Sequence, residues 1–218
     1  RKHTAGEHEV LRHTPSPLAG LAEPYFPRQS DVLELGCGVG RDAVFFTQKG
    51  HKVIATDSSK AVIEQDLKHF PDLGIEFSVL DMQDPLPYPS GSFDVGYANL
   101  SLHYYSHQKT REIVKEIARV LKKGGVLAFA CKSVDDFHHG GGKEVEEDIF
   151  VSDSGHVRHL FSVQYTKQLL EGLFNISLLD TVEEEYNGQN SNILRCIAQK
   201  AAKRGAFKKK VHLKYVDE

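Results

Sequence analysis

The chain has 218 residues, which is long enough for one α/β domain with a substantial core, and its formal net charge is -3. This charge gives no global field for nucleic acid, and no apolar run approaches the roughly 20 residues that span a bilayer. No signal peptide is visible, and three cysteines without framework spacing indicate reduced thiols. We therefore predict a cytoplasmic protein that is a monomer or homodimer. We expect it to bind neither a membrane nor a nucleic acid.

Predicted strands and helices alternate through the middle of the chain. The strands are expected over residues 32–35, 52–56, 75–80, 93–98 and 126–130, and the helices over 41–49, 60–69 and 110–121. The glycine pair at 124–125 is expected to end the last of these helices. This order predicts an α/β fold with a doubly wound, Rossmann-like, mostly parallel sheet. Ligands of such sheets bind beyond the carboxyl ends of the strands, so the residues just after each strand are the main candidates for a binding site.

A glycine-rich turn follows the first predicted strand. Residues 32–40 have the sequence VLELGCGVG, with Gly36, Gly38 and Gly40 at alternate positions before a predicted helix. Glycines at this spacing let the backbone turn tightly and approach a ligand closely, and the helix N-terminus favours negative charge. A nicotinamide-binding turn of the form G-x-G-x-x-G would need glycine at position 41, where the chain has Arg41. The turn therefore predicts a nucleotide-binding loop that departs from the nicotinamide-binding pattern.

Acidic residues follow the next two predicted strands. Asp57 lies about 20 residues beyond the turn, where a carboxylate can accept hydrogen bonds from both hydroxyls of a ribose. Asp81 can accept a bond from an adenine amine, and Met82 can pack along the ring. Each acid alone is equally explained as a solvated turn residue, but their recurrence at strand ends favours a binding site.

These segments together resemble the class I S-adenosylmethionine (SAM) dependent methyltransferases over about residues 10–200. The resemblance rests on E-x-G-x-G-x-G at 34–40, the acids at strand ends, the segment 99–104 and Leu-Lys-Lys-Gly-Gly at 121–125. It implies a seven-stranded sheet whose last strands, near 176–182 and 192–198, form an antiparallel edge pair. It also implies SAM as cofactor, S-adenosylhomocysteine as its product, and cofactor contacts from Glu34, Gly36, Cys37, Gly38, Asp57, Ser58, Asp81, Met82 and Asn99.

The chain also resembles one subfamily of these methyltransferases, and two arginines are further candidate cofactor contacts. Segment 11–17 and the sequence Gly40-Arg41-Asp42 look like the tellurite-resistance type of methyltransferase. Arg12 is expected to cover the cofactor carboxylate and Arg41 to sit at the rim, although both are equally explained as surface residues. Glu34 is expected to face the ammonium group of the cofactor.

The expected reaction is methyl transfer to a small molecule or small anion by in-line displacement, which positioning alone can accelerate greatly. A domain over residues 1–200 is predicted, with a flap-like insertion at about 133–160 and a basic tail at 201–218. Within the insertion, His156, Arg158 or His159 is hypothesised to face the acceptor as base or anion clamp, the alternative being a polar surface loop. His103, with Tyr104 and Tyr105, either lines the acceptor pocket or packs at the strand exit. No metal site is predicted, because no ligand spacing such as H-E-x-x-H occurs.

Three other functions are weighed against this one. A protein or RNA methyltransferase would use the basic tail to recruit its substrate. A regulatory domain would bind SAM without catalysis. A nicotinamide oxidoreductase is disfavoured by Arg41 and Asp81.

Overall fold

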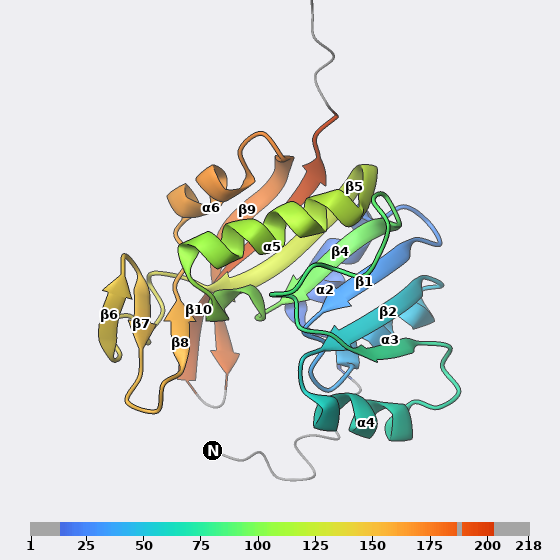
Figure 1. The fold of residues 1–218 in the computed structure, drawn as a ribbon, viewed down its shortest axis with the longest axis horizontal. Coiled ribbons are helices and arrows are strands. Elements are labelled where there is room, and N and C mark those ends of the chain that lie inside the picture. The colour runs from blue at the N-terminus through green and yellow to red at the C-terminus, as the bar shows by residue number, and fades with distance from the viewer. Residues whose placement is uncertain (1–13, 187–188, 203–218) are drawn as a thin grey trace, which may run out of the picture.

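The computed structural model describes residues 14–186 and 189–202 (Figure 1). Its main sheet has seven strands in the order β3-β2-β1-β4-β5-β10-β9. The strands are β1 (Asp31–Leu35), β2 (Lys52–Asp57), β3 (Glu76–Val79), β4 (Phe93–Asn99), β5 (Leu121–Lys132), β9 (Phe174–Tyr186) and β10 (Gln189–Lys200). β10 pairs antiparallel with both β5 and β9, whereas the remaining neighbours pair in parallel. The predicted seven-stranded, doubly wound sheet with an antiparallel C-terminal pair is confirmed.

Helices cover both faces of this sheet (Figure 1). They are α2 (Pro17–Ala22), α3 (Arg41–Gln48), α4 (Lys60–His69), α5 (His107–Val120) and α6 (Val163–Leu170), with short 3-10 turns η1 (Glu23–Tyr25) and η2 (Leu102–Tyr104). One hydrophobic cluster joins α5 and α6 to Leu33 and Phe129 of the sheet, and the other joins α2, α3 and α4 to Val32 and Ala128. Neighbouring strand residues thus enter opposite clusters, as expected for a sheet buried on both faces.

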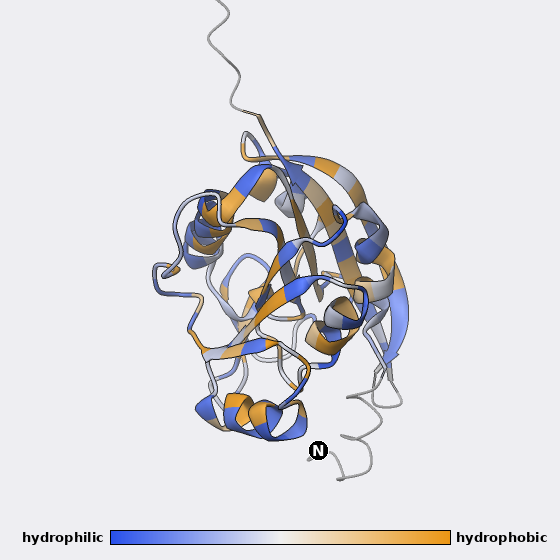
Figure 2. Cartoon of the chain, turned by 90° about the vertical axis from the view of Figure 1, so that its right-hand side faces the viewer, coloured by the Kyte–Doolittle hydropathy of each residue, from blue (hydrophilic) through white to orange (hydrophobic). Residues whose placement is uncertain are grey.

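Hydrophobic and hydrophilic residues follow one another within each helix, so the helices look striped in Figure 2. Helix α5 shows the basis of this pattern, because its buried positions include Ile113, Val114 and Ile117, which share one side of a helix. Within the described part of the chain, no helix is both long and apolar enough to cross a membrane.

The boundaries of two elements differ from the prediction. Helix α5 begins at His107, because the Ser106 side chain accepts a bond from the Lys109 amide and caps it there. It ends at Val120, and β5 starts immediately, so the glycine pair expected to end the helix lies inside a strand. A Cβ on Gly125 would lie 2.9 Å from the Asp94 carbonyl oxygen. The glycine there permits close approach to the start of β4 instead of terminating the helix.

A small antiparallel sheet is inserted between β5 and α6, within the predicted insertion at 133–160. It consists of β6 (Lys143–Glu146), β7 (Ile149–Val151) and β8 (Val157–His159). A bridge between Ser133 and Phe161 closes the base of the insertion. In Figure 1 the small sheet stands beside the main sheet, next to the start of α5. The insertion is therefore built on a hydrogen-bonded scaffold of its own.

Candidate functional site

The glycine-rich loop between β1 and α3 is held by backbone hydrogen bonds and leaves part of its backbone open to a ligand. The amides of Gly36 and Cys37 both donate to the Thr56 carbonyl at 2.8 Å, which ties the loop to the end of β2. A Cβ on Gly36 would lie 2.5 Å from Cβ of Ser101, so only glycine fits this position. At Gly38, which has a φ of 55°, an added Cβ would meet no atom within 4 Å. The backbone at Gly38 therefore faces open space that a ligand could fill.

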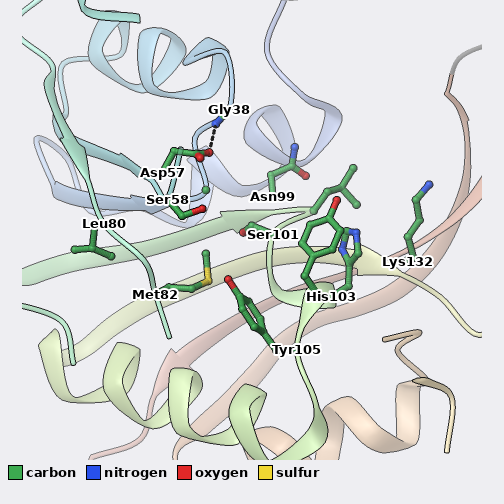
Figure 3. Close-up of a pocket in the computed structure, with 13 residues that line it drawn as sticks. Gly38, Asp57, Ser58, Leu80, Met82, Asn99, Ser101, His103, Tyr105 and Lys132 are labelled. Carbon is green, nitrogen blue, oxygen red and sulfur yellow. Dashed lines mark hydrogen bonds between the residues drawn. The ribbon is translucent and has the colours of Figure 1, made fainter. Parts of the chain in front are cut away.

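That space belongs to a cavity of about 400 Å³ at the carboxyl ends of the central strands (Figure 3). We refer to it as the main cavity. It is lined by Gly36, Gly38, Asp57, Ser58, Leu80, Met82, Asn99, Leu100, Ser101, His103, Tyr104, Tyr105 and Lys132. Six of the predicted cofactor contacts lie in this wall, namely Gly36, Gly38, Asp57, Ser58, Met82 and Asn99. The cavity lies where the winding of the sheet reverses between β1 and β4, as expected of doubly wound folds.

Asp57 is held in place by the backbone. One carboxylate oxygen accepts from the Gly38 amide at 3.1 Å, a bond drawn in Figure 3, and the other accepts from the Ser59 amide at 2.9 Å. Each carboxylate oxygen can accept more than one bond. Asp57 is therefore oriented at the cavity and keeps capacity to accept hydrogen bonds from ligand hydroxyls.

An apolar part of the wall is formed by Leu80, Met82 and Tyr105. Burial, with the nearby Asp81 and Asp57 carboxylates, raises the pKa of Tyr105 to about 12, so its hydroxyl stays protonated at neutral pH. Asp81 stands between two lining residues but is not itself in the wall. Its carboxylate instead accepts from the Gln83 amide at 2.9 Å and from the Gln83 side chain at 3.2 Å.

Neither Glu34, which precedes the glycine loop, nor Cys37, which is part of it, lines the main cavity. Glu34 is 2% exposed, and its Oε2 has no hydrogen-bond partner among the described residues. Burial, followed by repulsion from Asp42 and Asp66, raises the pKa of Glu34 well above its ordinary value. Burial likewise raises the pKa of the Cys37 thiol. The structure thus separates these two predicted contacts from the six in the wall.

The N-terminal segment is attached to the site through Asp42. This carboxylate accepts from the Ser16 amide, the Ser16 hydroxyl and the Tyr97 hydroxyl, each at 2.7 Å. The neighbouring Arg41 lines a separate hollow of about 380 Å³, which also includes Glu184 and borders the main cavity through Asn99 and Leu100. The other predicted arginine, Arg12, lies outside the described residues.

A further hollow of about 280 Å³ adjoins the main cavity, and we refer to it as the side hollow. It is lined by His103, Tyr104, Lys132, His138, His156 and Arg158. Three of these, His103, Tyr104 and Lys132, also line the main cavity, so the two spaces share a wall. The structure brings His156 and Arg158, predicted to face the acceptor, into this hollow.

His103 lies at the junction of the two spaces, where Figure 3 shows it beside Lys132. It is 4% exposed, and its Nδ1 has no partner among the described residues. Burial, followed by the positive charge of Lys132, lowers the pKa of His103 to about 3. The imidazole is therefore neutral at neutral pH. Burial also lowers the pKa of Lys132, although Asp136 opposes this effect.

His159, the third residue predicted to face the acceptor, lies elsewhere. It is fully buried, with its ring centroid 4.5 Å from those of His107 and Phe161 and 4.7 Å from that of Tyr165. Its Nδ1 lies 3.0 Å from the Tyr105 carbonyl oxygen. Burial, with the nearby His107, lowers the pKa of His159 to about 3. In this position His159 packs against aromatic rings at the base of the insertion, and it does not line the side hollow.

Two residues important to this geometry were not predicted from the sequence. Lys132 ends β5 and so obeys the same strand-end rule that selected Asp57, which could have identified it. Asp136 follows β5 by four positions in a loop and gave no comparable signal. Among residues 14–186 and 189–202, no three His, Cys, Asp or Glu side chains are grouped to hold a metal ion.

Part of the chain is similar in sequence to known methyltransferases. Residues 33–129, from β1 into β5, match the family model described as a methyltransferase domain. An uncharacterised methyltransferase of Synechocystis sp. is 31% identical over 113 residues, which cover 52% of this chain and 50% of that protein. The chain spans about half or less of the length of the curated relatives it matches first.

Solved structures extend the likeness over most of the chain. A SAM-dependent methyltransferase from Methanosarcina mazei matches with a TM-score of 0.72 at 23% identity, covering 83% of this chain and 96% of that one. The 1,6-didemethyltoxoflavin-N1-methyltransferase of Burkholderia thailandensis, solved with S-adenosylhomocysteine bound, has a TM-score of 0.69 at 19% identity, covering 85% and 77%. At these identities the likeness shows the fold. The fold is that of the class I SAM-dependent methyltransferases, and residues 33–129 are similar in sequence to a methyltransferase domain, in agreement with the resemblance noted in the sequence.

Proposed function

We propose that the chain is a SAM-dependent methyltransferase whose acceptor is a small, negatively charged molecule bound in the side hollow. One observation carries this proposal: the side hollow and the main cavity share His103, Tyr104 and Lys132. A molecule in one space would therefore lie against a molecule in the other, as a transfer reaction between two bound molecules requires.

The main cavity has the groups that SAM needs. Asp57 can accept bonds from the ribose hydroxyls, Leu80 and Met82 offer apolar surface to the adenine, and Gly38 leaves room for the cofactor to meet the backbone. Asn99, in the same wall, borders the hollow lined by Arg41 and could contact the amino-acid end of the cofactor. When bound, SAM supplies a methyl carbon made electrophilic by the attached sulfonium.

The side hollow has the groups that an anionic acceptor needs. Lys132 and Arg158 place two cationic side chains in its wall, and a guanidinium suits the planar oxygens of a carboxylate or phosphate. His103 lines both spaces together with Lys132. Because its pKa is about 3, it adds no positive charge next to a sulfonium, which a protonated imidazole would repel.

The contribution of this chain to the reaction is chiefly positional. Lys132 and Arg158 would anchor the negative end of the acceptor, and the shared wall would align its nucleophilic atom with the cofactor. Holding two reactants about 3 Å apart in line can lower the barrier by on the order of 7–11 kcal/mol.

The cofactor half can be tested first by thermal unfolding with S-adenosylhomocysteine, SAM and NAD in parallel. A ligand at 100 times its dissociation constant stabilises by about 2.7 kcal/mol, which should raise the melting temperature by roughly 5–10 °C. We expect a shift with both sulfur ligands and none with NAD. A shift with NAD alone would contradict the proposal.

The acceptor half can be tested with labelled SAM and small probes that carry a carboxylate or phosphate. We expect turnover of at least one such probe, and a KM increase of about tenfold or more for Arg158→Ala, since a charged hydrogen bond contributes about 1.5–3 kcal/mol. Arg111→Ala, at an exposed position of α5, is the matched control. Binding of S-adenosylhomocysteine without turnover of any probe would favour a regulatory domain or a macromolecular acceptor.

A further inference from the structure

A buried carboxylate fixes one histidine of the side hollow. Asp136 has a fully buried side chain, and its Oδ1 lies 2.5 Å from Nδ1 of His138. The His138 amide also donates to this oxygen, at 3.1 Å. The ring of His138 lines the side hollow, and its side chain is 22% exposed. The pair thus joins a buried acid to a partly exposed imidazole.

Residues from two strands of the main sheet hold the acid itself. The second oxygen of Asp136 accepts from the hydroxyl of Ser191 and from the Asn192 amide at 2.9 Å, and Nζ of Lys132 lies 3.6 Å away. Burial alone would raise the pKa of Asp136, but the bonds from Ser191 and His138 outweigh it and lower the pKa. Asp136 is therefore a fixed anion.

A fixed anion next to Nδ1 selects the tautomer of the imidazole. An ionised carboxylate can only accept hydrogen bonds, so Nδ1 must carry the proton. Nε2, on the opposite side of the ring, is then the atom with a free lone pair. The same relation between a carboxylate and a histidine orients the general base in acid-histidine dyads of unrelated enzymes.

We propose that His138 is the general base of this protein and that Asp136 is its positioning residue. This inference rests on the proposed function, and it narrows the acceptor to one whose nucleophilic O–H, N–H or S–H is protonated at neutral pH. The lone pair of Nε2 takes that proton as the nucleophilic atom bonds to the methyl carbon. The C–S bond breaks with its electron pair retained by sulfur. The products are the methylated acceptor, S-adenosylhomocysteine and an imidazolium whose charge faces Asp136.

The other histidines of the side hollow are less suited to this step. His103, with a pKa of about 3, is too weak a base at neutral pH, since proton transfer is most efficient when the pKa lies near the working pH. His156 is exposed, and its backbone bonds to Ser152: its amide donates to the Ser152 hydroxyl and its carbonyl accepts from the Ser152 amide. Of the three, only His138 has a ring held by a buried carboxylate.

The titratable and charged groups that surround His138 in the side hollow come from three directions. Asp136 lies in the same loop, Lys132 ends β5, and Arg158 and His156 come from β8 and the turn before it. A pH profile must therefore be compared between variants and not read from one protein alone.

The first experiment needs no acceptor. Long-range proton–nitrogen NMR on histidine-labelled protein reports which ring nitrogen of each histidine carries the proton. The signal that is missing from the spectrum of His138→Gln is the signal of His138. We expect His138 with Nδ1 protonated and Nε2 bare at about pH 8, and loss of this preference in Asp136→Asn. His139→Gln, the exposed neighbour, is the control and should leave the signal unchanged. A proton on Nε2, or an imidazolium through about pH 8, would overturn the proposal.

The second experiment separates a base from a structural role. The probes 4-hydroxybenzoate and 4-mercaptobenzoate share a carboxylate anchor, but at about pH 8 the phenol is protonated and the thiol is ionised. We expect His138→Gln to lower kcat on the phenol by on the order of 100-fold or more, with partial recovery at high pH, and to leave kcat on the thiolate within about threefold. Equal losses on both probes would overturn the proposal. If the wild-type protein methylates neither probe, the acceptor class in the proposed function fails, while the NMR result still decides the tautomer of His138.

Discussion

Gly36 and Ser101 meet across the floor of the main cavity. A Cβ on Gly36 would lie 2.5 Å from Cβ of Ser101, while the Ser101 hydroxyl donates to the Leu35 carbonyl at 2.7 Å. The loops that follow β1 and β4 are thereby locked together at the point where the sheet winding reverses. This contact explains why the first glycine of the turn is a packing requirement.

Replacing Gly36 with alanine should therefore damage both the fold and the site. The positive φ of 79° and the contact with Ser101 together should lower the free energy of unfolding by about 1–3 kcal/mol, measured by urea denaturation. Gly20→Ala is the control, because an added Cβ in α2 meets no atom within 4 Å and alanine favours a helix. Equal stability of the two variants would contradict the packing argument.

Gly38→Ala should separate stability from binding. The site is open, so only the strain of a positive φ applies, at about 1–2 kcal/mol. The new methyl group would occupy space assigned to the cofactor. We expect titration calorimetry to show S-adenosylhomocysteine binding weakened by about tenfold or more. Wild-type affinity in this variant would place the cofactor elsewhere.

Asp57→Asn tests the assignment of the ribose contact. An amide keeps the size of the side chain but loses the charge and one acceptor oxygen, and bonds to charged groups contribute about 1.5–3 kcal/mol. The dissociation constant for S-adenosylhomocysteine should rise by about 10- to 100-fold. Asp72→Asn, at an exposed position, should not change it.

Much of this architecture follows from local patterns in the sequence. The span predicted for α4, residues 60–69, is the observed one because Ser59 caps the helix, accepting from the Val62 amide. The surroundings of the side hollow were less predictable. Asp136, Ser191 and Lys132 meet only because β10 returns beside β5, and no local pattern encodes a contact between residues 55 positions apart. His159 was misplaced for a related reason: a histidine in a polar segment gives no sign that aromatic rings from α5 and α6 will enclose it.

Glu34 should make stability depend on pH. Its pKa in the folded protein is raised above the ordinary 4.5, so its contribution to stability is complete below that value and is lost as the pH rises through the folded pKa. Glu34→Gln removes the cost of burying a charge. The melting temperature of the variant, relative to wild type, should therefore increase between about pH 5 and pH 8. A constant difference over this range would show that Glu34 has an ordinary pKa.

The antiparallel return of β10 has a practical consequence for handling the protein. Lys200 lies beside the start of β5, where its Nζ donates to the Leu121 carbonyl at 2.7 Å, whereas Lys132 at the other end of β5 lines both cavities. The 12 residues of β5 separate these two ends by on the order of 35 Å. A fluorophore or surface tether attached at Ala202 would therefore leave both cavity mouths open to solution. Immobilised protein should then bind small molecules as the free protein does.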